Sequence, residues 1–139
     1  MSFRVPHEVS DDGMSVIESL APEGDSPPLH VHRTEDELFH VLEGSLTLRL
    51  DEDLVDLEAG ETALAPKGVP HTYRVDSPTT RWLVVTTRGD FEAFVRAASR
   101  EPEDDGLPES GGAPTPEQQQ ALATLAAAHG IELVGPPLV

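Results

Sequence analysis

Short runs of alternating apolar and polar residues fill the first two thirds of the chain, and glycine or proline separates them. The clearest run, Ser-Leu-Thr-Leu-Arg-Leu at 45–50, alternates with period two, which is typical of a strand with one buried face. Further runs bounded by turn residues predict strands at 15–20, 54–57, 61–65, 71–75 and 81–87. About eight short, evenly spaced strands favour an antiparallel sandwich or barrel. The expected fold class is therefore all-β.

The pattern changes after Arg88. Apolar residues then recur at the spacing i, i+3, i+4 and i+7, which predicts a helix capped by Asp90, with a stripe of Phe91, Phe94, Val95 and Ala98. An acidic loop rich in glycine and proline is expected over 101–114. A second helix should begin with a capping box at Thr115 and end at Gly130, with a stripe of Leu122, Leu125 and Ala126.

These patterns predict two regions. A β-barrel should occupy residues 1–88, with residues 1–13 as a loop or an N-terminal arm. A C-terminal extension of two helices should occupy residues 89–139 and bury its stripes on the outside of the barrel or across its mouth.

Composition narrows the classes of function. Twenty-six acidic residues against nine basic ones give a formal net charge of −17, which argues against nucleic acid and anionic membranes as partners. The absence of cysteine excludes a disulfide framework and is compatible with a reducing cytoplasm. No apolar signal segment and no run as long as a membrane span is visible. We therefore expect a soluble cytoplasmic protein.

The residues with the most distinctive chemistry lie at 24–44. His30 and His32 are two apart, so in a strand both imidazoles project to the same face, and Glu37 follows. Imidazole and carboxylate are the ligands that first-row divalent metals take when no thiolate is present. His71, at the start of a predicted strand after a tight turn, is the candidate for a fourth ligand.

The chain resembles the cupins, and the resemblance covers roughly residues 14–88. The first cupin motif, G-x5-H-x-H-x3–4-E-x6-G, is matched by Gly24, His30, His32, Glu37 and Gly44. The second, G-x5-P-x-G-x2-H-x3-N, is matched by Gly60, Pro66, Gly68 and His71, whereas Val75 replaces its final asparagine. The resemblance implies a jelly-roll barrel in which His30, His32, Glu37 and His71 bind one divalent metal. It also implies a homodimer.

The remaining polar residues have simpler interpretations. His40 lies three positions after Glu37, so in a strand it should face outward. Glu35 and Asp36 are expected in a solvated turn, with the alternative that one of them reaches the barrel mouth. His129 should lie in the last turn of a helix. His7 has no evident role. Six apolar or aromatic residues either line a substrate pocket or form ordinary core: Phe39, Val41, Leu46, Leu48, Tyr73 and Trp82.

Three functions remain open at this stage. The chain resembles small quercetin-dioxygenase-like cupins, which favours a metal-dependent dioxygenase acting on a small aromatic or enolisable hydroxylated compound, with Glu37 as the base. A Lewis-acid isomerase, decarboxylase or polyketide-type cyclase is the first alternative, and a non-catalytic small-molecule-binding module is the second. Nickel, manganese, iron, cobalt, copper and zinc all suit the ligand set.

Overall fold

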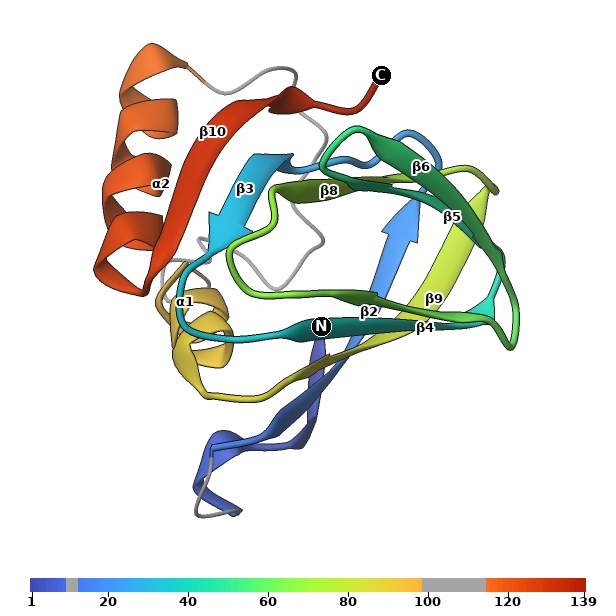
Figure 1. The fold of residues 1–139 in the computed structure, drawn as a ribbon, viewed down its shortest axis with the longest axis horizontal. Coiled ribbons are helices and arrows are strands. Elements are labelled where there is room, and N and C mark those ends of the chain that lie inside the picture. Colours follow the sequence, from blue (N-terminus) through green and yellow to red (C-terminus); the bar gives the residue numbers. More distant parts are fainter. Residues whose placement is uncertain (10–12, 99–114) are drawn as a thin grey trace.

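A computed structural model describes residues 1–9, 13–98 and 115–139, which form two facing antiparallel sheets of five strands each (Figure 1). One sheet has the order β1 (Ser2–Val5), β2 (Ser15–Pro22), β9 (Thr79–Thr86), β4 (Glu37–Glu43) and β7 (Thr62–Ala65). The other has the order β10 (Ile131–Pro137), β3 (Pro28–His32), β8 (His71–Val75), β5 (Ser45–Leu50) and β6 (Asp53–Glu58). The predicted all-β class is confirmed.

Alternation along the strands builds the core between the sheets. In β4 the side chains of Phe39 and Val41 point inward and are buried, while His40 lies on the other face and bonds Thr62 through its Nδ1 atom (2.7 Å). The inner faces of the neighbouring strands add the remaining buried apolar residues, among them Ile17, Leu46, Leu48, Val75, Trp82 and Val84. Val75, which replaces the motif asparagine, is thus part of this core. The outward position predicted for His40 is confirmed.

The first residues of the chain differ from the prediction of a loop or arm. Ser2–Val5 form β1, which pairs with β2, and His7–Val9 form a 3-10 helix, η1. Alternating exposure along β1 matches its place at the edge of the sheet. β1 has only four residues, too few to show a period-two pattern clearly in the sequence.

The C-terminal segment contains both predicted helices, α1 (Asp90–Ala98) and α2 (Pro116–Ala128). Asp90 is the first residue of α1, and the capping box of Thr115 with Gln118 is present at the start of α2. The acidic loop expected at 101–114 lies outside the described residues. The segment also contains a strand that the sequence analysis did not predict, because β10 pairs antiparallel with β3.

The helices lie at the end of the barrel where β3 ends. α2 runs along β10, and α1 contacts α2 (Figure 1). The C-terminal segment therefore lies beside the strand that carries His30 and His32. Across the described ranges, every helix is too short or too polar to span a bilayer.

Candidate metal centre

Three strands bring the four candidate ligands together. His30 and His32 lie on β3, Glu37 is the first residue of β4, and His71 is the first residue of β8. The register of β3 and β8 places His30 directly opposite His71. All four side chains are buried or nearly so, with His30 the most accessible at 9%. Residues up to 41 positions apart thus converge because the sheets pair strands that are distant in the chain.

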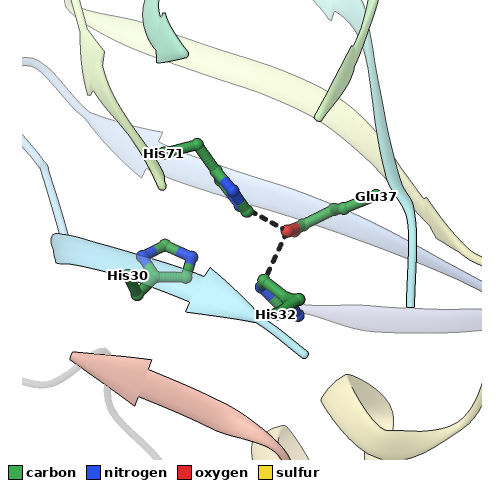
Figure 2. A group of neighbouring side chains, drawn as sticks. All are labelled: His30, His32, Glu37 and His71. Carbon is green, nitrogen blue, oxygen red and sulfur yellow. Dashed lines mark hydrogen bonds and ion pairs between the residues drawn. The ribbon is translucent and has the colours of Figure 1, made fainter. Parts of the chain in front are cut away.

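The four side chains offer one ligand atom each within 4.8 Å of one another. The Oε2 atom of Glu37 lies 2.9 Å from Nε2 of His32 and 2.8 Å from Nε2 of His71. Figure 2 shows this carboxylate between the two rings, with His30 alongside on β3. The ring of His30 lies 4.4 Å from the ring of His71, centroid to centroid.

Hydrogen bonds to the opposite ring nitrogens orient the three imidazoles. The Nδ1 atom of His30 lies 2.7 Å from the Pro28 carbonyl oxygen, and that of His71 lies 3.2 Å from the Val69 carbonyl oxygen. Nδ1 of His32 lies 3.2 Å from the carboxylate of Glu35. These oxygens accept from Nδ1–H, so Nε2 is the atom that each neutral ring would offer to a metal, and in His71 this Nε2 is hydrogen-bonded to the Glu37 carboxylate at 2.8 Å. Metal-binding histidines are commonly oriented in this way.

The position of His32 Nε2 is a further test of whether a metal fits here. This atom is buried and close to Glu37, yet it forms no properly angled hydrogen bond with any described residue. The contact with Glu37 is therefore an ion pair without an aligned hydrogen bond. Three imidazole nitrogens and one carboxylate oxygen match the donor preferences of divalent manganese, iron, cobalt, nickel, copper and zinc. The residues fit such an ion.

The charges within the cluster are strongly coupled. Burial raises the pKa of the Glu37 carboxyl, but the adjacent His32 and His71 outweigh burial and hold that pKa well below its usual range. Burial lowers the pKa of His32, yet Glu37 and Glu35 raise it to about 10. Burial and the neighbouring His71 lower the pKa of His30 to about 4. At neutral pH His30 is thus neutral and Glu37 is ionised, which are the forms that bind metals, whereas His32 has to release a proton when a metal binds.

Glu35 corrects one expectation. It was predicted in a solvated turn, but its side chain is only 1% exposed. Its Oε1 atom accepts a hydrogen bond from the backbone N–H of Phe91 at 2.7 Å in addition to its contact with His32. Burial raises the pKa of Glu35. Asp36 is half-buried and accepts from the backbone N–H of Lys67.

An apolar pocket with a volume of about 300 Å³ opens from the cluster. His30 and Glu37 line it, together with Phe39 and Tyr73. Burial raises the pKa of Tyr73, whose ring packs edge-on against those of Phe39 and Trp82. Six residues had two possible roles in the sequence analysis, pocket lining or core. The other four belong to the buried core: Val41, Leu46, Leu48 and Trp82.

The C-terminal segment supplies much of the pocket wall. All four residues of the predicted α1 stripe line the pocket, as do Leu122 and Ala126 of α2 and Ile131 and Leu133 of β10. Leu125, the other member of the α2 stripe, does not contribute to it. Amphipathic spacing identified these helix faces, but it did not identify what the faces cover.

A second group of ionisable residues lies outside this site. His7, for which the sequence showed no role, forms an ion pair through Nδ1 with the fully buried Glu92 on α1. Glu8 lies close enough to complete a cluster with this pair. His129 caps the C-terminal end of α2, and its ring lies 6.2 Å from that of Phe94, centroid to centroid.

Comparison with known families agrees with the fold. The Cupin domain family model matches residues 16–86, so the chain belongs to the cupin family. The structure of KdgF from Halomonas sp. covers 63% of this chain and 76% of its own at a TM-score of 0.58 and 16% identity. A double-stranded β-helix protein from Klebsiella pneumoniae covers 63% and 75% at a TM-score of 0.54 and 22% identity. Both likenesses concern the fold alone.

One relative is similar in sequence over nearly two thirds of this chain. Quercetin 2,3-dioxygenase from Bacillus subtilis (strain 168) is 43% identical over 87 residues, which amount to 63% of this chain. The match spans only 26% of the length of that enzyme. The similarity thus covers about a quarter of the Bacillus protein.

Proposed function

We propose that His30, His32, Glu37 and His71 bind one divalent transition metal and that the protein is a metal-dependent dioxygenase. One observation carries the catalytic part of this proposal: His30 and Glu37 line the apolar pocket directly. Structural metal sites are closed by their protein ligands, whereas catalytic sites keep a position open for substrate. A ligand set exposed to a pocket favours catalysis.

The metal, when bound, supplies a Lewis acid that lowers the pKa of a coordinated hydroxyl group and a centre for oxygen chemistry. The chain supplies the orientation and the base. Glu37 is ionised at neutral pH because of its imidazole neighbours. Its Oε2 atom faces His32 and His71. The other oxygen, Oε1, is therefore the atom that accepts the hydroxyl proton of the substrate. The apolar wall excludes water from this proton transfer.

The substrate class follows from the pocket. Most of its described lining is aliphatic or aromatic, which suits a small aromatic or enolisable hydroxylated compound. The similarity to the Bacillus quercetin 2,3-dioxygenase supports oxygen-dependent chemistry on such a compound. Because that similarity covers a quarter of the enzyme, the reaction of the present chain needs its own assay.

Oxygen uptake distinguishes the proposed dioxygenase from the two alternatives. The protein should be loaded separately with manganese, iron, cobalt, nickel, copper or zinc and assayed with phenols and enols in the presence and absence of air. We expect oxygen consumption that requires metal and is lost in Glu37→Gln. Equal turnover without air would identify the Lewis-acid isomerase or cyclase. Ligand binding with no product under either condition would identify a binding module.

We also propose that the protein is a cytoplasmic homodimer. Support comes from the cupin resemblance and from Leu54 and Leu64, which are 62% and 49% exposed on β6 and β7 at the outer edges of the two sheets. Exposed apolar side chains on edge strands favour association with another chain. Light scattering coupled to size-exclusion chromatography measures the mass directly, and a mass of about 15 kDa (the chain itself is 14.9 kDa) would reject the dimer.

A further inference from the structure

The ligands and the pocket wall come from different parts of the chain. The four candidate ligands lie within residues 16–86, the part that matches the Cupin domain. More than half of the described wall lies beyond that part, including Phe94 on α1, Leu122 on α2 and Ile131 on β10. The shared fold therefore accounts for the cluster of candidate ligands, whereas the segment after residue 88 shapes the pocket in front of that cluster.

The polar groups of the pocket belong to the barrel. Among the described lining residues only His30, Glu37 and Tyr73 have polar side chains. The Tyr73 ring is held between Phe39 (6.1 Å) and Trp82 (5.1 Å, both between centroids), so its position is restricted. A phenol can donate one hydrogen bond to a ligand, and Tyr73 is among the residues that line the pocket. A ligand in this pocket meets polar groups from the barrel and apolar groups from the C-terminal segment.

The volume limits the ligand. A cavity of about 150 Å³ holds one benzene ring. The pocket has about twice that volume, about 300 Å³. It therefore has room for about two aromatic rings, which is less than the three rings of a flavonol such as quercetin.

We propose that the C-terminal segment restricts the ligand of the metal site to phenols or enols with one or two rings. In this arrangement the hydroxyl edge lies against Glu37 and Tyr73, and the ring edge contacts Phe94 and Leu122. The assignment rests on the proposed function for the location of the reacting group. It narrows the substrate class to compounds smaller than the substrate for which the Bacillus relative is named.

The test compares two fluorescent probes that each carry one hydroxyl group, 2-naphthol with two rings and 3-hydroxyflavone with three. Both are titrated into the zinc-loaded protein without oxygen, so that only binding is measured. We expect 2-naphthol to bind at least about tenfold more tightly than 3-hydroxyflavone. Tyr73→Phe should lower the affinity for 2-naphthol by up to about tenfold and leave the affinity for naphthalene unchanged. Only 2-naphthol has a hydroxyl group that can form the hydrogen bond lost in this variant.

Two leucines on α2 provide a matched pair of wall variants. Leu122 lines the pocket, whereas Leu125 borders a separate surface hollow. Leu122→Ala should enlarge the pocket and reduce the preference for 2-naphthol several-fold, while Leu125→Ala leaves the preference unchanged. Circular dichroism reports whether each variant is folded, and Phe94→Leu replaces Leu122→Ala if the latter is not.

The outcomes separate this inference from the dioxygenase proposal. Equal affinity of the two probes in the wild type, or equal effects of Leu122→Ala and Leu125→Ala, would overturn the size limit. So would a failure of both probes to bind. A size preference that follows the wall variants, together with no oxygen uptake for any metal, would refute the dioxygenase proposal and leave the size limit standing.

Discussion

The carboxylate of Glu35 lies 3.2 Å from Nδ1 of His32, and both side chains are almost completely buried. The same carboxylate oxygen accepts a hydrogen bond from the backbone N–H of Phe91, at the start of α1. Phe91 also lines the pocket, and its ring contacts His32 edge-on. Glu35 therefore connects a proposed metal ligand with the helix that forms part of the pocket wall.

Removal of this carboxylate should weaken metal binding without removing a ligand. We expect Glu35→Ala to lower metal affinity by about 10- to 100-fold, because His32 loses the partner that orients its ring. Glu35→Gln should recover part of the loss, since its amide oxygen can still accept from His32. Chelator competition measures the affinity. Glu43→Ala, which removes an exposed carboxylate on β4, controls for the change of net charge, and an equal loss in that variant would contradict the positioning role.

Loss of a proposed ligand should abolish stoichiometric metal binding. We expect His30→Ala and His71→Ala to remain β-rich and folded, because neither side chain belongs to the apolar core. His40→Ala is the matched control, since this histidine lies on the outer face of β4 and should leave metal content unchanged. Elemental analysis of protein purified without a metal-chelating column gives the content. Full occupancy in both ligand variants would disprove the assignment.

The His7–Glu92 ion pair should make stability depend on pH. The hydrogen bond to Glu92 raises the pKa of His7 above 6.5, so this contribution is complete below pH 6.5 and disappears as the pH rises through the raised pKa. Burial raises the pKa of Glu92, but the hydrogen bonds from His7 outweigh it and lower the pKa below 4.5. Its contribution is therefore present above pH 4.5 and is lost as the pH falls through the lowered pKa.

The variant His7→Gln tests this dependence. Its Tm should fall furthest below that of the wild type between pH 4.5 and 6.5, and the gap should narrow on either side. Arg96, 3.6 Å from Glu92, remains in the variant and keeps part of the pairing of the buried carboxylate. Thermal unfolding followed by circular dichroism across the pH range provides the values. A gap that does not change with pH would show that the ion pair adds no net stability.

Two motif glycines should respond differently to alanine. Both have left-handed backbones, with φ of +88° at Gly44 and +90° at Gly60. That conformation costs an alanine about 1–2 kcal/mol. A Cβ at Gly44 would also lie 2.6 Å from the carbonyl oxygen of Thr79, whereas one at Gly60 would meet no atom within 4 Å. Gly44→Ala should therefore lower the free energy of unfolding, measured in urea, clearly more than Gly60→Ala. Equal losses would show that the backbone at Thr79 moves freely.

The sequence by itself determined the barrel and the set of candidate ligands. Period-two alternation is a local property, so residues such as 45–50 reveal a half-buried strand without knowledge of its partner. The spacing of His30, His32 and Glu37 can also be recognised from the sequence alone, because strand geometry places the two imidazoles on one face. The face of α1 was visible for the same reason.

Only the tertiary structure decided the surroundings of these groups. Glu35 resembles any acidic residue in a turn until α1 packs over it and buries it beside His32. The strand β10 follows a helix and ends in Gly-Pro-Pro, which gives no strand signal until β3 offers a partner. Pocket size and the role of Leu122 likewise depend on how distant segments pack. Periodicity records which face of an element is covered, whereas contacts between segments far apart in the chain decide what covers it.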